Sequence, residues 1–338
     1  QEKHDKGGAF IGNKDEEAEQ LKNYMKLVRQ ADIENWYDAL QEWTFKTIFI
    51  DLTIHQAQAI VEVTKLNRSG NSSAVNSEQL IVIKELEDEI DKEIKKFGNN
   101  GAFVKLSSRS AKDASAVSER TQNIFHQLIQ HEINQGLSFS SMDENLLVIL
   151  LNRAHIDALR VYSGQEALSL LTNSERVIED LELGFEDKVN FSQKIVIREW
   201  VVLPLDFELR SFVKHRKMNA LSQYYHYVYF PQLHSNKDSI QAKVLAFFEQ
   251  IKDKVPFDSF VMDFGYDPSS DTLKIIELNP YSFSTSGCLF NWKDAKDLKI
   301  LEEGPFELRI ESQPYPNLFK QLSPPWKKLI SDATERFK

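Results

Sequence analysis

The stretch that most constrains this chain is FVMDFGYDPSSDTLKIIELNP, residues 260–280. Two largely apolar runs flank a Pro-Ser-Ser-Asp turn, which is the pattern of a β-hairpin. Because residues two apart along a strand share a face, Glu277 and Asn279 project together while Leu278 points to the opposite face. If the two arms pair, Asp263 can lie beside them. The sequence therefore predicts a hairpin with one apolar face and one face that carries carboxylate and amide oxygens.

This oxygen-bearing face is a candidate metal site. Mg²⁺ commonly takes one or two carboxylates and completes its shell with waters and phosphates. Asp263, Glu277 and Asn279 are the candidate ligands. The alternative is a solvated polar face on an edge hairpin. The mostly apolar flanking residues, and the Asn that precedes Pro280, favour the metal-binding interpretation.

Composition excludes several classes of function. The 338 residues are enough for two or three packed subdomains. The net charge of −10 disfavours a general nucleic-acid-binding surface, which is normally basic. The single cysteine, Cys288, excludes an internal disulfide and favours a reducing compartment. No apolar run has membrane-spanning length, so we expect a cytoplasmic protein without a membrane partner.

The order of the predicted elements indicates the fold class. Strands and helices mix without a regular βαβ alternation, and several strands read as hairpins, so we expect an α+β fold with mostly antiparallel sheets. No GxxxxGK[ST] or GxGxxG motif occurs, which argues against P-loop and Rossmann nucleotide sites. We expect a flexible leader over residues 1–18, an N-terminal α+β subdomain over 19–197 and a C-terminal subdomain over 198–338.

Periodicity and turn signals place the elements. We expect helices at about 19–42, 77–97 (capped by Ser77), 118–135, 164–172 (opened by a Ser163/Glu166 capping box) and 238–253. We expect strands at 44–52, from 101 onward and at 194–203, and a hairpin in FELRSFVK and MNALSQYYHYVYF. Residues 146–154 read as a buried strand or a short core helix, and the tail after 304 as mostly irregular with a final helix near 326–337.

Charged residues inside the apolar strands are further candidates, because a buried charge is costly unless it is paired or used. The structural alternative is a set of internal salt bridges, such as Glu208 with Arg210 or Lys105. The functional interpretation is that lysine and arginine hold phosphate oxygens beside the metal. The candidates for this nucleotide pocket are Lys105, Arg198, Glu199, Glu208, Arg210 and Gln223.

Four separated segments occur in a specific order. They are VKLSSRSAKDA (104–114), IVIREWVVLPLDFELRSFV (195–213), ALSQYYHY (220–227) and VMDFGYDPSSDTLKIIELNPYSFSTSGCLFNW (261–292). Together they resemble the cell division cycle protein 123 family, a divergent branch of the ATP-grasp fold.

The resemblance implies an ATP and Mg²⁺ site in a cleft between two α+β subdomains. Carried over by position, Lys105 would contact phosphate and Glu208 would lie near the ribose. The adenine hinge would be Glu199, Trp200 and Val201. The remaining pocket residues would be Arg210 and Gln223, and the Mg²⁺ ligands would be Asp263, Glu277 and Asn279.

The resemblance also implies a partner. Members of this family chaperone the assembly of eukaryotic translation initiation factor 2 by binding its gamma subunit. The sequence departs from the family pattern in three places. SSRSAKDA follows Lys105 where an Asn-Trp-Ser-type sequence is usual, Glu277 stands where Asp is usual, and the chain shows PPWKKLISDATERFK in place of an extended acidic tail.

Two classes of function therefore stay open. One is an ATP-dependent assembly chaperone with a protein client. The other is an ATP-grasp ligase or phosphotransferase that acts on an acid, a peptide or an RNA end. Substrate-dependent release of ADP or AMP would distinguish them.

Overall fold

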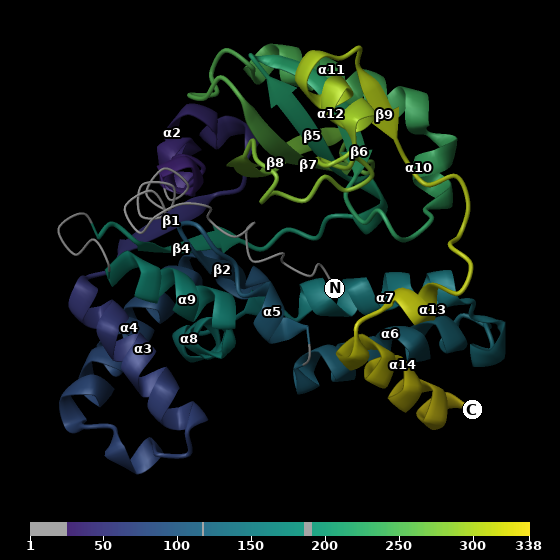
Figure 1. The fold of residues 1–338 in the computed structure, drawn as a ribbon. Coiled ribbons are helices and arrows are strands. Elements are labelled where there is room, and N and C mark those ends of the chain that lie inside the picture. Colours follow the sequence, from purple (N-terminus) through teal and green to yellow (C-terminus); the bar gives the residue numbers. More distant parts are fainter. Residues whose placement is uncertain (1–25, 117, 186–190) are drawn as a thin grey trace. The chain divides into compact units, whose positions relative to one another are not determined.

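The structure is a computed structural model that describes residues 26–116, 118–185 and 191–338 (Figure 1). Its contacts divide the chain into two units, each assembled from two separate segments. The predicted leader, residues 1–18, lies outside the described residues. We name the two units after their sheets and describe each by itself.

The five-stranded unit comprises the described residues up to Phe45 together with Val202–Gln321, and the four-stranded unit comprises Lys46–Val201 together with Leu322–Lys338. The sequence predicted two consecutive subdomains that change at residue 197. The contacts instead place the change at residue 201, and they assign one segment from each end of the chain to the opposite unit.

The four-stranded unit has a fully antiparallel sheet in the order β1-β4-β2-β3. Its strands are β1 (Thr47–Asp51), β4 (Lys194–Glu199), β2 (Ala102–Leu106) and β3 (Arg160–Val161). One face, with Val104, Ile195 and Ile197, belongs to a continuous apolar core. The helices that complete this core are α3 (Ile54–Arg68), α4 (Ser77–Ile94), α8 (Gly164–Asn173) and α9 (Glu175–Gly184). The sequence did not predict α9, although Ser174 caps it and its apolar residues have helical spacing.

A group of helices completes this unit. It contains α5 (Lys112–Ser115), α6 (Glu119–Asn134), α7 (Glu144–Asp157) and α14 (Pro324–Phe337), and Figure 1 shows α14 beside α6 and α7. Segment 146–154 lies in α7, so the helical alternative is confirmed. This helix buries apolar residues on most of its circumference, and for that reason its sequence lacks a clear helical period.

The helix starts differ in detail from the predicted ones. Asn76, and not Ser77, caps α4 by accepting a hydrogen bond from the Gln79 amide, and the Gln79 side chain accepts from the Asn76 amide in return. At α8 the Ser163 hydroxyl accepts from the Glu166 amide as predicted. The Glu166 carboxylate, however, accepts from the Tyr162 amide at 2.9 Å, one residue earlier than in a capping box.

The five-stranded unit has a sheet in the order β8-β7-β5-β6-β9. Its strands are β5 (Glu208–Lys214), β6 (Lys217–Gln223), β7 (Phe260–Asp267), β8 (Thr272–Pro280) and β9 (Glu307–Arg309). Both predicted hairpins, β5-β6 and β7-β8, are confirmed, and the β6-β9 pair is parallel while the others are antiparallel.

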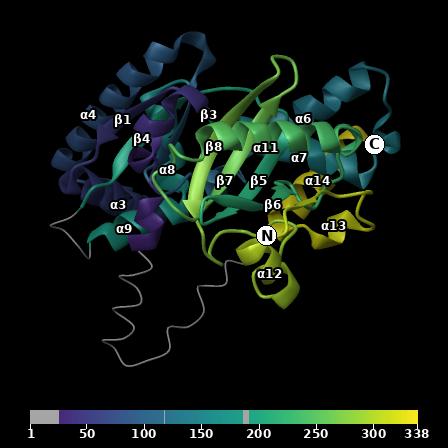
Figure 2. The same cartoon turned by 90° about the horizontal axis from the view of Figure 1, so that it is seen from above.

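The two faces of this sheet have different covers. Helix α11 (Lys237–Ile251), which follows the short helix α10 (Pro231–Ser235), covers one face, and its Phe247 ring lies 5.8 Å from that of Phe264. Figure 2 shows α11 crossing β7 and β5. On the other face, Phe212, Ala220 and Val261 pack with Phe290 and with Leu301 of α12 (Ala295–Glu303). This second face also carries the polar residues described below.

Two predicted segments differ from the structure in this unit. In the described part of the predicted helix 19–42, residues 26–30 are helical, but the helix then breaks into short 3-10 turns and α2 (Tyr37–Leu40), with Trp36 fully buried among them. The tail after 304 is less irregular than predicted, because it supplies β9 and α13 (Leu318–Gln321) before α14 begins. Mixed helices with mostly antiparallel sheets confirm the α+β class. Within the described ranges, no helix is both long enough and apolar enough to cross a membrane.

Candidate functional site

A row of polar residues crosses the entire five-stranded sheet. The strand registers align Glu277 of β8, Asp263 of β7, Arg210 of β5, Ser222 of β6 and Arg309 of β9. Residues aligned in this way project from the same face of a sheet. We call these five residues the polar row. The hairpin pattern predicted Asp263 and Glu277 on one face, and the register confirms that placement.

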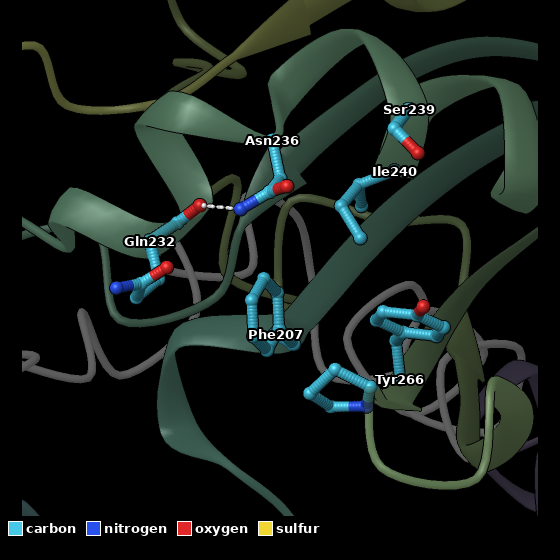
Figure 3. A pocket seen from close by; sticks show the side chains of 7 residues that line it. Phe207, Gln232, Asn236, Ser239, Ile240 and Tyr266 are labelled. Atoms are coloured by element: carbon cyan, nitrogen blue, oxygen red, sulfur yellow. Dashed lines mark hydrogen bonds between the residues drawn. The ribbon is translucent and has the colours of Figure 1, made fainter.

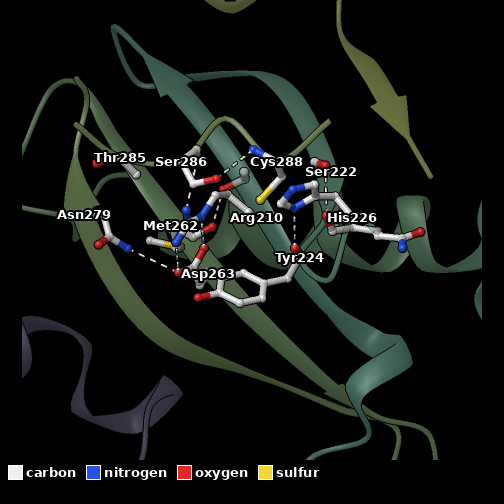
Figure 4. A network of polar contacts seen from close by, with 12 residues as sticks. Arg210, Ser222, Tyr224, His226, Met262, Asp263, Asn279, Thr285, Ser286 and Cys288 are labelled. Carbon is white, nitrogen blue, oxygen red and sulfur yellow. Dashed lines mark hydrogen bonds and ion pairs between the residues drawn. The ribbon is translucent and has the colours of Figure 1, made fainter. Parts of the chain in front are cut away.

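The centre of the polar row is a buried ion pair (Figure 4). Arg210 Nε donates to Asp263 Oδ1 and Arg210 Nη2 donates to Asp263 Oδ2, both at 2.8 Å. The two side chains are only 7% and 2% exposed. Burial by itself would lower the pKa of Arg210, but the Asp263 carboxylate outweighs burial and raises the pKa of the guanidinium above its usual value. Of the two sequence interpretations, an internal salt bridge is thus present, with Asp263 as the partner of Arg210.

The other two predicted metal ligands flank Asp263. Glu277 is its register partner on β8 and is half-buried. Asn279 Nδ2 donates to Asp263 Oδ2 at 3.2 Å. The three predicted metal ligands therefore come together on one face. Among the described residues, no group of three or more His, Cys, Asp and Glu side chains could hold a metal. Two carboxylates and one amide fit the limited protein ligation that Mg²⁺ uses when phosphates and waters supply the remaining oxygens.

The two remaining pocket candidates of this unit differ in position. Glu208 lies two residues before Arg210 on β5 and so faces the same side. Gln223 is the register partner of Leu209, so it faces the helix-covered side. Its amide nitrogen donates to the carbonyls of Tyr225 and Val228 at 2.7 and 2.6 Å, and its oxygen accepts from the Glu311 amide. The structure thus uses the Gln223 amide to hold neighbouring backbone; a nucleotide contact by this residue stays a prediction.

The four-stranded unit carries a second set of candidates on the sheet face opposite its apolar core. Lys105 and Arg198 project from this face and are 4% and 5% exposed. Arg160 of β3 joins them, because Arg160 and Arg198 are both register partners of Phe103. We call Lys105, Arg198 and Arg160 the cationic face. Their register partners on the neighbouring strands are uncharged, whereas Arg210 of the polar row has Asp263 as a register partner. The sequence reading missed Arg160, because a two-residue strand leaves no periodic signal.

The predicted adenine hinge begins at Glu199, the last residue of β4, and continues into the segment that follows the strand. The Glu199 carboxylate accepts from the Lys46 amide at 2.9 Å, so it holds the neighbouring strand. The Trp200 ring lies 5.9 Å from the Arg160 guanidinium carbon. The Trp200 indole nitrogen is buried and forms no hydrogen bond with a described residue. Val201 is 42% exposed. An exposed apolar residue beside an indole suits stacking on a flat ring, but an adenine contact stays a prediction.

The loop after Lys105 is fastened inside the four-stranded unit. Arg109 donates to both carboxylate oxygens of Asp180 on α9, at 3.1 and 3.2 Å, and Ser108 donates to the same carboxylate at 2.7 Å. The Arg109 side chain therefore anchors the loop to α9.

A separate pocket of about 270 Å³ lies in the five-stranded unit (Figure 3). Phe207, Ile240 and Tyr266 give it an apolar wall, and Gln232, Asn236 and Ser239 line its polar side. Tyr266 alternates with Gly265 and so points to the face opposite Asp263, which places the pocket on the α11 side of the sheet. No predicted site residue lines it, and its volume is small for a ligand site.

Comparisons with known proteins agree with this fold. The model of the D123 family matches residues 153–324, just over half of the chain. Cell division cycle protein 123 of Phaeosphaeria nodorum is 28% identical over 154 residues, which span 42% of this chain and 40% of that protein. A protein of Aspergillus oryzae named translation initiation factor eIF2 assembly protein is 29% identical over 141 residues, which span 38% of this chain and 34% of that protein.

A solved structure covers more of the chain. Cdc123 from Schizosaccharomyces pombe aligns over 84% of this chain and 96% of its own, with a TM-score of 0.60 and 21% identity. The likeness shows a shared fold. By contrast, the sequence matches to the curated relatives of P. nodorum and A. oryzae span less than half of each relative's length.

Proposed function

This chain belongs to the D123 family, and on that premise we propose that it assists the assembly of translation initiation factor eIF2. One observation carries the proposal. Relatives that bear the name translation initiation factor eIF2 assembly protein, from Aspergillus oryzae and Xenopus laevis, are each 29% identical to this chain over their matching stretches. The resemblance of the four sequence segments adds the gamma subunit as the proposed contact within eIF2, and a cytoplasmic location.

We further propose that the protein binds ATP with Mg²⁺. Asp263, Glu277 and Asn279 would hold the metal, which would neutralise the charge of the phosphates. The support is that three oxygen-bearing side chains predicted from the hairpin pattern lie together on one sheet face. The proposed role of Asp263 does not require that it leave Arg210, because each carboxylate oxygen has more than one lone pair.

The cationic face supports phosphate binding by the four-stranded unit. Three cations that project from one sheet face raise the local positive potential, and such a potential favours an anionic ligand. Lys105 and Arg198 are the proposed phosphate contacts there, with Arg160 beside them. The proposal thus assigns cation binding to the polar row and anion binding to the cationic face.

The test is co-purification with recombinant eIF2 subunits. We expect the chain to retain the gamma subunit at low salt in the presence of ATP and Mg²⁺, and to increase the yield of the heterotrimer when all subunits are co-expressed. The net charge of −10 favours encounter with a basic partner surface and predicts weaker binding as salt rises. Absence of a complex at micromolar concentrations would contradict the proposal. Substrate-dependent release of ADP or AMP would then favour the ligase or phosphotransferase alternative.

A further inference from the structure

Arg210 contacts two separate elements with one rigid group. Its Nε and Nη2 atoms hold Asp263 on β7, as described above. Its Nη1 atom donates to the backbone oxygen of Ser286 at 3.0 Å. The Tyr224 ring lies 4.9 Å from the guanidinium carbon and so packs beside the group (Figure 4). Because a guanidinium is planar, the direction of the Asp263 carboxylate and the position of Ser286 are fixed together.

Ser286 belongs to residues 281–292, which we call the row loop. Two other members of the polar row hold the same loop. The Ser222 hydroxyl accepts from the Leu289 amide at 3.2 Å, and Arg309 Nη1 donates to the Leu289 oxygen at 3.0 Å. The loop turns tightly at Gly287, where an added Cβ would meet the Phe290 oxygen at 2.0 Å. The row loop is therefore a closely wound segment that the polar row fastens to the sheet.

We propose that Arg210 is a positioning residue that couples the Asp263 carboxylate to the row loop, and that it makes no contact with the nucleotide. Two observations carry this assignment. The guanidinium is buried, and the donors that face Asp263 are already engaged, so a phosphate would have to replace a paired carboxylate. One N–H donor of Nη1 is directed at the loop backbone. The coupling rests on these contacts, and only its consequence for Mg²⁺ rests on the proposed function.

The coupling passes from the Asp263 carboxylate, through the Arg210 guanidinium, to the row loop. If Asp263 is replaced by a neutral side chain, the guanidinium loses the paired charge and at least one of the two bonds that orient it, and we expect its bond to Ser286 to weaken. A divalent cation that binds Asp263 changes the charge on the same carboxylate. We therefore expect cation binding to change the contact between Arg210 and the row loop. Lysine keeps the charge but is a point donor and cannot hold both acceptors in fixed directions.

The test is hydrogen exchange of the row loop, without nucleotide, in the wild type, Arg210→Lys and Asp263→Asn. We expect amide exchange within 281–292 to be about tenfold faster in both variants. Asp267→Asn is the matched control, because Asp267 lies on the same strand but bonds only to Ser269 and Ser270 of the following turn. Row-loop exchange equal to the wild type in Arg210→Lys and Asp263→Asn would overturn the coupling.

A second variant distinguishes loss of the coupling from general destabilisation of the fold. The double variant Arg210→Gln with Asp263→Asn replaces the ion pair by two neutral amides, so no buried charge is left alone. We expect its melting temperature to lie above that of Asp263→Asn, while its row loop still exchanges about tenfold faster than in the wild type. A row loop as protected as in the wild type would show that the guanidinium is dispensable and would overturn the assignment.

A nucleotide titration separates positioning from direct contact. In Arg210→Lys we expect affinity for ATP in EDTA to be unchanged, and the gain in affinity on adding Mg²⁺ to fall about tenfold. A loss of affinity in EDTA would make Arg210 a nucleotide contact and overturn the second half of the proposal. If the wild type binds no ATP, the proposed nucleotide function fails, and the exchange experiment still decides the coupling.

Discussion

The two sheets of this protein manage buried charge in opposite ways. In the five-stranded sheet, Arg210 has a carboxylate as its register partner and forms two hydrogen bonds with it. In the four-stranded sheet, Lys105 and Arg198 project from one face, and their register partners are the uncharged Val196, Thr47 and Phe103. The first sheet therefore balances Arg210 with a carboxylate on the neighbouring strand. The second sheet balances Lys194 with Asp51 in the same way, but its Lys105 and Arg198 have only uncharged register partners.

From this difference we expect the charges of the polar row to stabilise the fold and the charges of the cationic face to bind a ligand. Removing one partner of a buried pair is costly, because the other charge is left buried without compensation. A group of like charges on one face raises the local potential, which attracts an opposite charge. We therefore expect substitutions in the polar row to act first on stability, and substitutions in the cationic face to act first on ligand affinity. The following predictions test that contrast in order of expected size.

Asp263→Asn should have the largest effect. It leaves the buried guanidinium of Arg210 without its anion, which costs about 3–5 kcal/mol of the free energy of unfolding. Urea denaturation measures the loss. The double variant with Arg210→Gln should recover at least half of it. Equal stability of Asp263→Asn and the wild type would contradict the claim that the polar row acts first on stability.

Lys105 should show the reverse pattern. We expect Lys105→Met to weaken ATP binding by about 1.5–3 kcal/mol, the range for a hydrogen bond to a charged group, and to change stability little because the apolar stem is kept. Isothermal titration calorimetry measures the affinity. Lys194→Met is the control, since Lys194 lies on the same sheet face and pairs with Asp51. Normal ATP affinity with a lowered melting temperature would make Lys105 a structural charge.

The pH dependence of stability should differ between the units. Burial, with a smaller contribution from nearby Lys112, lowers the pKa of His155 from 6.5 to about 4. As pH falls from about 6.5 to about 4, the unfolded chain binds a proton that the folded chain does not, so stability falls over that window. We expect a loss of about 2 kcal/mol. The protection factors of the α7 amides, which are corrected for the intrinsic pH dependence of exchange, should fall over this range, and His155→Gln should flatten that fall. A loss of protection that is confined to β7 over this pH range would contradict the assignment to His155.

Glu277→Gln should have the smallest effect. The residue is half-buried at the end of the polar row, so we expect a change in stability below about 1 kcal/mol. The gain in ATP affinity on adding Mg²⁺ should fall by about 1 kcal/mol, because one carboxylate ligand is lost. Titrations with Mg²⁺ and with EDTA measure that difference. An unchanged gain would exclude Glu277 from the metal site.

The sequence contained the local information of the site but not its cross-strand order. Alternation placed Glu277 and Asn279 on one face, and both hairpins could be predicted from their turns. Alternation cannot tell which strand lies beside β7, so it could not predict Arg210 as the partner of Asp263. The same reason hid Ser222 and Arg309, since β9 comes from a tail without strand periodicity.

Other differences have equally specific causes. Asn76 and Ser77 are both good capping residues, and the choice between them depends on the Gln79 side chain. Helix α7 is buried on so many sides that its sequence fits a strand as well as a helix. Both cases show a local pattern that permits two answers until tertiary packing selects one.

The interleaved make-up of the two units has a consequence for synthesis on the ribosome. Helix α14 completes the unit that is otherwise built from the first half of the chain, through contacts such as Gln122 with Asp332 and His155 with Trp326. Strand β9 likewise completes the other sheet late. Neither unit can close before nearly all of this sequence has emerged, because long-range pairings form only when both partners exist. A stop codon before α14 would therefore damage the earlier-made unit first and spare the β5-β9 sheet.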